Sequence, residues 1–322
     1  MKKKNFAKHN VSMTTSLRGL CKNLLEEQKR NWPLLVAAHR DLANVRTRLI
    51  SAGGYDVYVQ FNPARSVSSG AAVDHESIKN RPCFLCDSNL PHEQKGVLYK
   101  NNYLILCNPA PIFAEHFTVV HMQHQPQAIA GSVDSLLDFT ADMSPDYAVF
   151  YNGPACGASA PDHLHFQAMP ANTLPLQQSL PGNFRLIKDA AVRIYYPEGI
   201  NRTALVLEGR DKDSLLAQFD RLLRAAQNVL SVRSEPMINV LCSYDDGVWR
   251  IIVFLRSKHR PDAFYAEGEQ RIFVSPGTID MAGFIITPLE ADFNSLDFKK
   301  ISSLYAEVSL SEDTMEKIIN EL

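Results

Sequence analysis

The chain has 322 residues, a length that predicts about two domains. Hydrophobic residues make up 45% of it and charged residues 21%, as in an ordinary globular protein, which excludes a disordered, collagenous or coiled-coil chain. The 33 Lys and Arg against 35 Asp and Glu give a formal charge of −2. The chain therefore lacks the overall positive charge that would favour nucleic acid or an anionic membrane as a partner.

The cysteines and the first residues bear on the cellular compartment. Six cysteines are too few for a disulfide scaffold, which favours a reducing environment. The opening residues MKKKNFAKHN pass into polar sequence without an apolar core and do not resemble a secretory signal. No stretch approaches the ~18 apolar residues of a membrane span. The sequence predicts a soluble cytoplasmic protein with no membrane partner.

The first elements are predicted to be helical. From Thr15 to about Ile50, apolar residues recur at spacings of three and four, and Pro33 divides this pattern into two amphipathic helices. Tyr55 to Phe61 alternates β-branched and aromatic residues and predicts a strand. The polar residues Asn62 to Asn80 predict a loop. We assign residues 1–54 to an N-terminal helical segment with a packing role.

Two cycles of strands and helices follow, and they predict an α+β fold with mostly antiparallel sheets. The first cycle has predicted strands at Tyr103–Cys107, Phe117–His121, Tyr147–Tyr151 and His163–Met169, and a helix at Ala128–Met143. The second has strands at Arg193–Tyr196, Ala204–Glu208, Ile238–Ser243, Val248–Leu255 and Phe284–Pro288, and a helix at Ser214–Leu230. We place one half at residues 55–180 and the other at 181–322, with a shared rhythm that suggests an old duplication.

A histidine pair after a small-residue loop is the most informative motif. In an extended segment His163, His165 and Gln167 would project from one face. The preceding residues Gly157 to Ala160 are small, so their backbone amides can approach an anion closely. An isolated H-x-H is more often a surface strand or a core pair, and it also occurs in metal sites. The combination favours a phosphate beside an imidazole.

A C-x-x-C motif is the second signal. The spacing of Cys83 and Cys86 suits one zinc ion, but a tetrahedral site needs two further ligands and the chain has no second C-x-x-C. Histidines downstream can supply them, namely His92, His116, His121, His124 and His163. Unliganded thiols and redox chemistry are the alternatives, although a redox motif would open a helix after a strand.

These motifs occur in an order that resembles a known family. C-x-x-C, a histidine after a strand, and a small-residue loop leading to H-x-H-x-Q are similar to one branch of the histidine triad superfamily. That branch contains galactose-1-phosphate uridylyltransferase, diadenosine tetraphosphate phosphorylase and the GDP-hexose phosphorylases. Gly157 to Gln167 carries most of the resemblance, and Ser275 to Gly283 resembles the GDP-hexose group more weakly. The resemblance covers about residues 55–290. It implies HIT-like antiparallel sheets with flanking helices and two related halves in one chain.

The resemblance also implies roles for single residues. His165 would be the nucleophile that attacks the α-phosphorus and becomes nucleotidylated, and Gln167 would hydrogen-bond the phosphoryl group. The loop residues that would hold the phosphates are Asn152, Gly157, Ala158 and Ser159. A structural zinc would be bound by Cys83, Cys86, His124 and His163, with His121 and His116 as rivals for the third position.

Some positions depart from the family pattern or have a second explanation. Asp162 is an extra residue before the first histidine, and Gln167 replaces the third histidine of the triad, which favours transfer over hydrolysis. Arg65 lies where the uridylyltransferases carry a phosphate-contacting arginine, or is a solvated loop charge. Lys258, in a cationic run from Arg256 to Arg260, either binds substrate or acceptor phosphate or belongs to a solvated surface. Asp280 and Met281 are expected to be structural.

The chemistry of the motif fits this division of roles. An imidazole with a pKa near ~6.5 is a capable nucleophile at neutral pH if its other nitrogen has a partner, and a carbonyl of the preceding loop suits that purpose. We expect a nucleotidyltransferase or phosphorylase that acts on a nucleoside-diphosphate sugar or a dinucleoside polyphosphate. Its acceptor would be phosphate or a sugar phosphate.

Several questions stay open on the sequence alone. The alternatives to transfer are a nucleotide hydrolase and a non-catalytic nucleotide-binding zinc protein. A nucleic-acid module is disfavoured because the C-x-x-C lacks the histidine pair of a finger. The base and the leaving group are not specified, and a monomer with an internal pseudo-dimer and a homodimer are both compatible with two related halves.

Overall fold

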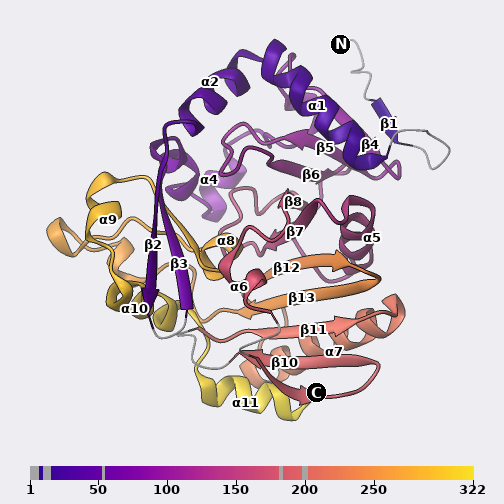
Figure 1. The fold of residues 1–322 in the computed structure, drawn as a ribbon, viewed down its shortest axis with the longest axis vertical. Coiled ribbons are helices and arrows are strands. Elements are labelled where there is room, and N and C mark those ends of the chain that lie inside the picture. Colours follow the sequence, from indigo (N-terminus) through magenta and orange to yellow (C-terminus); the bar gives the residue numbers. More distant parts are fainter. Residues whose placement is uncertain (1–6, 10–15, 53–54, 181–183, 198–201) are drawn as a thin grey trace.

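The computed structural model describes residues 7–9, 16–52, 55–180, 184–197 and 202–322. A long twisted sheet runs through the molecule, helices cover one of its faces, and a small sheet with further helices covers part of the other (Figure 1). Each face of the long sheet carries its own apolar core. The two halves of the chain therefore share one continuous sheet.

The long sheet has eleven strands, and neighbours are antiparallel except at β1 and β4. In spatial order the strands are β1 (Ala7–His9), β4 (Gly96–Tyr99), β5 (Tyr103–Cys107), β6 (Phe117–His121), β8 (His165–Pro170), β7 (Tyr147–Asn152), β12 (Ile238–Asp245), β13 (Val248–Leu255), β11 (Leu205–Gly209), β10 (Val192–Pro197) and β9 (Phe184–Lys188).

The two ends of this sheet repeat one topology. In the first half a meander β4-β5-β6 is followed by helix α5 (Val133–Met143) and the pair β7-β8, in the order 4-5-6-8-7. In the second half β9-β10-β11 is followed by helix α7 (Lys212–Leu230) and the pair β12-β13, in the order 9-10-11-13-12. The halves meet where β7 pairs with β12. The predicted α+β fold with antiparallel sheets, flanking helices and two related halves is confirmed.

The helices of the first face form where the sequence supplies caps and an apolar stripe. Ser16 caps α1 (Leu17–Asn31) through the amide of Gly19, and Asp211 caps α7 through the amide of Ser214. Their buried residues join α5 and α11 (Glu312–Asn320) in one core against the sheet. Pro33 opens α2 (Pro33–Leu42), as predicted.

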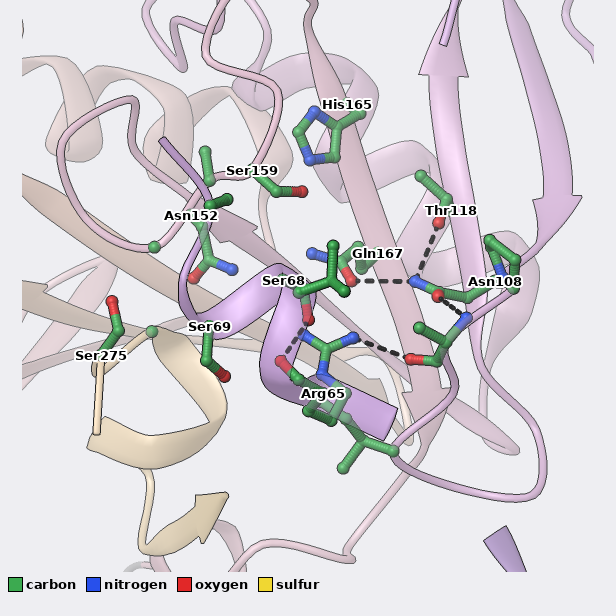
Figure 2. Close-up of a pocket in the computed structure, with 18 of the residues that line it drawn as sticks. Arg65, Ser68, Ser69, Asn108, Thr118, Asn152, Ser159, His165, Gln167 and Ser275 are labelled. Carbon is green, nitrogen blue, oxygen red and sulfur yellow. Dashed lines mark hydrogen bonds between the residues drawn. The ribbon is translucent and has the colours of Figure 1, made fainter. Parts of the chain in front are cut away.

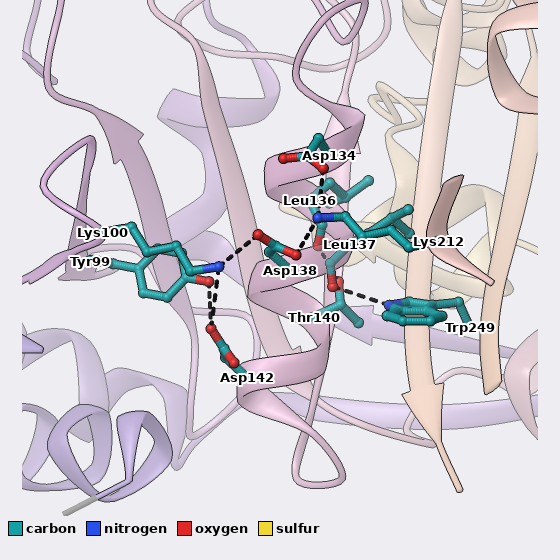
Figure 3. Close-up of polar contacts among 10 residues, drawn as sticks. All are labelled: Tyr99, Lys100, Asp134, Leu136, Leu137, Asp138, Thr140, Asp142, Lys212 and Trp249. Carbon is teal, nitrogen blue, oxygen red and sulfur yellow. Dashed lines mark hydrogen bonds and ion pairs between the residues drawn. The ribbon is translucent and has the colours of Figure 1, made fainter. Parts of the chain in front are cut away.

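Helix α5 connects the two halves through polar contacts (Figure 3). Lys212, at the start of α7, pairs with Asp134 at 2.6 Å and also with Asp138 of α5. The indole Nε1 of Trp249 on β13 donates to the carbonyl of Leu137 at 3.1 Å. On the other side, Lys100 reaches Asp138 at 2.6 Å. The contacts of Lys212 and Trp249 with α5 thus add to the pairing of β7 with β12 in joining the two halves.

A small sheet lies on the opposite face of the long one. Its order is β14 (Phe284–Thr287), β3 (Tyr55–Phe61) and β2 (Arg46–Ala52), with β14 parallel to β3. It packs with α9 (Glu290–Ser295) and α10 (Phe298–Val308) over the second core. The other short helices are α3 (Ser66–Ser69), α4 (His75–Lys79), α6 (Pro175–Gln178) and α8 (Thr278–Met281).

Two predictions for the N-terminal region are wrong. Residues 46–50 form strand β2 and not the end of a helix, because they pair in register with β3 and because the Arg48 guanidinium donates to the carbonyls of Phe293 and Leu296. The predicted loop at 62–80 contains α3 and α4. The segment 1–54 is therefore helical only in part, and its residues 1–6, 10–15 and 53–54 lie outside the described residues. The limits placed near residue 180 stay a prediction.

None of the described helices combines the length and the apolar character that a bilayer crossing needs.

Candidate active site

A cavity of about 500 Å³ lies against the long sheet at β5, β6, β8 and β7 (Figure 2). Segments on either side of it, around α3, the C-x-x-C turn and α8, form its walls. Most of the substrate-binding and catalytic residues predicted from the sequence line it, namely Arg65, Asn152, Gly157, Ala158, Ser159, His165 and Gln167. The structure thus brings together in one cavity residues that are about a hundred positions apart in the chain.

Strand alternation places His165 and Gln167 side by side. Both belong to β8, where residues two apart share a face, and both line the cavity. His163 precedes the strand, and its ring contacts the sulfurs of Cys83 and Cys86 instead. The predicted common face of three polar residues is therefore wrong for His163, whose ring belongs to the second cluster described below.

His165 has one ring nitrogen occupied and the other available. Its Nδ1 lies 2.8 Å from the carbonyl oxygen of His163, so Nδ1 carries the proton and donates it, and the Nε2 lone pair has no partner among the residues that the structure describes. The main chain of His165 is fixed by Gln127, whose side chain accepts from its amide at 2.8 Å and donates to its carbonyl at 3.0 Å. The loop carbonyl expected to aim the imidazole is present.

Burial also keeps the His165 ring neutral. The side chain is 4% exposed, and burial lowers the pKa of its imidazole to about 4. A ring that is uncharged at neutral pH keeps the Nε2 lone pair that a nucleophile needs.

Gln167 is oriented by a residue that sequence reasoning missed. Its Oε1 accepts from His116 Nε2 at 2.9 Å and from Asn108 Nδ2 at 3.4 Å, so its two amide protons remain as donors. His116 Nδ1 accepts from the amide of Ile112 at 3.2 Å, which leaves the proton on Nε2. The sequence offered His116 only as a rival zinc ligand, which is wrong. Its signal, a histidine at the start of a buried strand, has no distinctive spacing.

His116 predicts a pH dependence of stability. Burial, with a smaller effect of Arg65, lowers the pKa of its imidazole to about 3. Below about pH 6.5 His116 is protonated in the unfolded chain but stays neutral in the folded one. Its contribution to the free energy of unfolding is therefore fully present above that pH and is lost as the pH decreases. Between pH 7 and 5, wild type should lose about 2 kcal/mol more unfolding free energy than His116→Gln. Urea unfolding at several pH values measures this, and parallel curves would contradict it.

The loop at the other side of His165 is held by the second half of the chain. Asn152 Oδ1 accepts from Asn239 Nδ2 at 2.9 Å, and from the amide and the hydroxyl of Thr278 at 2.8 and 2.7 Å. Gly157 has a φ of 93°, and a Cβ there would lie 3.0 Å from the Cα of Gly277. A side chain at Gly157 would therefore be strained and would separate the two loops.

Arginines supply the positive charge of the cavity. Arg65 Nη1 donates to the carbonyl of Ala110 at 2.7 Å (Figure 2), and its buried Nε has no hydrogen-bond partner among the described residues. Burial lowers the pKa of Arg65 to about 10, so it stays charged at neutral pH. Arg260 also lines the cavity and donates from Nε to Ser275 Oγ at 2.9 Å and from Nη2 to the carbonyl of Ser69 at 3.2 Å.

The structure does not bring Lys258 into the cavity. Its Nζ lies 2.8 Å from an oxygen of Asp262 and 2.5 Å from one of Glu307. From the same cationic run, Arg260 and His259 are the residues that line the cavity. Asp280 has the structural role expected of it, because its carboxylate accepts from the amides of Gly277 and Ile286 at 2.9 and 3.0 Å.

The four predicted zinc ligands form a second cluster beside this cavity. The donor atoms of Cys83, Cys86, His124 and His163 all lie within 4.8 Å of one another. The Sγ to Nδ1 distances are 3.2 Å from Cys83 to His163 and 3.3 Å from Cys86 to His124. Around a tetrahedral zinc these separations would be about 3.6 Å. Small shifts of these four side chains would therefore be enough to bind a zinc ion.

The orientation of His163 also fits metal binding. Its Nε2 lies 2.7 Å from the main-chain oxygen of His121, so Nε2 donates and Nδ1 faces the sulfurs with its lone pair. The ring of His121 is turned to Gln123 and is absent from the cluster. Of the rivals for the third position, His124 is the one that the structure places with the cysteines. Two sulfur and two imidazole donors form a set typical of structural zinc.

Comparison with known proteins gives two family matches and several similar folds. Residues 24–170 match a family described as a domain of unknown function, DUF4922, and residues 183–322 match the family "GDPGP1-like, C-terminal domain". A structure of yeast Ap4A phosphorylase Apa2 in complex with Ap4A is 18% identical with a TM-score of 0.61, covering 89% of this chain and 97% of that one. The chain has the fold of an Ap4A phosphorylase.

Two further structures of the yeast phosphorylase agree. The form without a named ligand is 17% identical with a TM-score of 0.61, over 89% of this chain and 97% of that one. The AMP complex is 17% identical with a TM-score of 0.59, over 90% and 96%. No curated protein matches the chain by sequence. The predicted resemblance to diadenosine tetraphosphate phosphorylases is confirmed for the fold, and the second half matches a GDPGP1-like family.

Proposed function

We propose that the chain is a nucleotide phosphorylase that works through a covalent nucleotidyl group on His165. The observation that carries the proposal is the orientation of the His165 ring, whose Nδ1 donates to the His163 carbonyl so that Nε2 is available. The ring lines a cavity together with arginines and the Gly157–Ser159 loop. The fold shared with yeast Ap4A phosphorylase, and the GDPGP1-like match of the second half, support the same class of reaction.

In the first step, the Nε2 lone pair of His165 attacks the α-phosphorus of the bound nucleotide. The bond from that phosphorus to the bridging oxygen breaks, and the leaving group departs as a sugar 1-phosphate or a nucleotide. The imidazole becomes positively charged when it forms the phosphorus–nitrogen bond. The His163 carbonyl stabilises that charge because it already accepts the Nδ1 proton at 2.8 Å.

In the second step, an oxygen of inorganic phosphate attacks the same phosphorus from the side that the leaving group has vacated. The phosphorus–nitrogen bond breaks, a nucleoside diphosphate forms, and His165 is neutral again. Both steps place negative charge on nonbridging oxygens, where the Gln167 amide and the Gly157–Ser159 loop can donate. Arg65 and Arg260 are suited to the flanking phosphates.

The dimensions of the cavity support a substrate larger than a mononucleotide. Its volume of about 500 Å³ lies within the range of small-molecule sites and extends across several strands of the sheet. A nucleoside-diphosphate sugar or a dinucleoside polyphosphate fits this description. The sparse cysteines favour the cytoplasm as the compartment in which it acts.

The zinc proposed for the Cys83 cluster has a structural role. When bound, it would join the C-x-x-C turn, which forms a cavity wall, to His163, which lies two residues before the start of β8. The carbonyl of His163 is the oxygen that orients His165. Binding of the metal by these four residues would therefore help to fix the position of that carbonyl.

Gln167→Ala should lower kcat about 100-fold and change KM much less, because the amide donors are needed most when charge develops on the phosphoryl oxygens. Gln178→Ala is a matched control, since Gln178 is exposed and bonds the carbonyl of Asn172. Steady-state kinetics with a turned-over substrate measure both constants. An unchanged kcat in Gln167→Ala would contradict the role.

Product identity tests the proposed reaction. Purified protein is incubated with a panel of nucleoside-diphosphate sugars and dinucleoside polyphosphates, with and without inorganic phosphate, and the products are separated by ion exchange. A nucleoside diphosphate that forms only with phosphate is the expected result. A nucleoside monophosphate formed equally well without phosphate would identify a hydrolase, and absence of turnover across the panel would contradict the proposal.

A further inference from the structure

One end of the cavity is apolar and lies two strands away from His165. Across β5, β6 and β8 the register aligns Leu106 with Thr118 and Thr118 with Gln167, so these residues share the face of the sheet that carries His165. Strands are spaced about 4.8 Å apart, which places the β5 end about 10 Å from β8. Leu85 and Leu90 complete the apolar walls there. The Gly157–Ser159 loop and Arg260 also line the cavity.

A single buried amide side chain lies among these leucines. Gln94 is 6% exposed and lines the cavity. Its Nε2 donates to the carbonyl of Cys107 at 3.4 Å, which directs Oε1 away from that carbonyl. Within the described part of the chain, Oε1 accepts no hydrogen bond. Because Gln94 lines the cavity, its Oε1 is available to accept a hydrogen bond from a ligand there.

The backbone on both sides of Gln94 is held by helix α1. Gln28, which is fully buried, donates from Nε2 to the carbonyl of Glu93 at 3.1 Å and accepts from the amide of Lys95 at 2.9 Å. These two hydrogen bonds explain why the buried face of α1 carries a polar residue, Gln28. They fix the residues before and after Gln94. The N-terminal helix thereby positions a residue of the cavity.

We infer that Gln94 recognises the nucleobase of the substrate, with Oε1 accepting an N–H from the edge of the base between Leu85, Leu90 and Leu106. The inference rests on the proposed function, because it assigns the apolar end of the same cavity to the base. The apolar walls accept the ring faces, and the Gln94 oxygen selects an edge that presents N–H donors. A base that presents an acceptor atom to Oε1 is disfavoured, because neither that atom nor Oε1 then receives a hydrogen bond.

Binding of ligands with and without a base tests this assignment. Titration calorimetry on wild type, Gln94→Met and Gln28→Met uses GDP, IDP, ADP and pyrophosphate. In Gln94→Met the nucleoside diphosphate that binds wild type most tightly should lose roughly tenfold or more in affinity, while pyrophosphate changes less than about twofold. The differences among the three bases should shrink in the same variant. Gln28→Met should show the same pattern to a smaller extent, because it only frees the loop.

A further variant guards against a general effect on folding. Gln178→Met changes an exposed glutamine outside the cavity and should behave as wild type. Equal losses for nucleoside diphosphates and pyrophosphate in Gln94→Met, or no loss at all, would overturn the inference. If no nucleoside diphosphate binds wild type, the proposed function fails first, and the two failures are therefore distinguishable.

Discussion

His165→Ala is expected to lower turnover by at least about 10³-fold while the protein stays folded. The ring is the only imidazole of β8 that lines the cavity, and its free Nε2 is the atom that forms the covalent bond in the proposed mechanism. Alanine leaves the carbonyl of His163 without its partner but removes no buried charge, because the ring is neutral. The loss should therefore fall on kcat with little effect on nucleotide affinity.

The control for this variant is another histidine whose loss leaves the cavity intact. His39 lies on α2 and does not line the cavity, so His39→Ala should keep near wild-type turnover. Circular dichroism and a thermal melt establish that both variants are folded. Turnover within about tenfold of wild type in a folded His165→Ala protein would contradict the role of His165 as nucleophile.

Cys83→Ser is expected to abolish zinc binding and to lower the free energy of unfolding by about 3 kcal/mol or more. Cys83 is buried, and its Sγ is 3.2 Å from His163 Nδ1, so its loss removes a ligand and leaves the imidazole without a partner. Burial, with a contribution from Cys83, raises the pKa of the Cys86 thiol to about 11. Two neighbouring thiolates therefore need the positive charge that a zinc ion supplies.

His121 and His124 provide a matched pair for the metal. His124→Ala should reduce bound zinc from about one per chain to a small fraction, because His124 Nδ1 lies 3.3 Å from the Cys86 sulfur. His121→Ala should keep the metal, because only the main-chain oxygen of His121 contacts His163. Elemental analysis of the purified proteins measures the zinc. Retained zinc in Cys83→Ser, or lost zinc in His121→Ala, would contradict the assignment.

Local patterns were sufficient to predict most of the fold. The alternation in Tyr55–Phe61 and the apolar runs of β5, β6 and β7 gave the correct strands, because a buried strand restricts its own composition. The stretch that became β2 was assigned to a helix because Leu49 continues the spacing of Leu42 and Val45. Its strand conformation depends on pairing with β3 and on carbonyls near residue 293, neither of which is local information.

The candidate site divides in the same way. The small-residue loop Gly157–Ala160, His165 and Gln167 lie close together in the chain, so their spacing could be recognised in the sequence. The two cysteines of the zinc cluster have the spacing that binding to one metal ion requires. His116 and Gln94 act through single hydrogen bonds to residues far along the chain, and nothing in their neighbourhood distinguishes them from other buried polar residues. Arg260 was found only as part of a charged run, since the fold decides which cation of that run reaches the cavity.

Intact-protein mass spectrometry tests the central claim most directly. The protein is mixed with each member of the nucleotide panel in the absence of phosphate, and the reaction is quenched without acid because phosphorus–nitrogen bonds are acid-labile. We expect one adduct with the mass of a nucleotidyl group, located on His165 by peptide mapping, absent from His165→Ala and discharged by inorganic phosphate. An adduct on another residue, or phosphate-dependent turnover that His165→Ala retains, would contradict a covalent mechanism at this histidine.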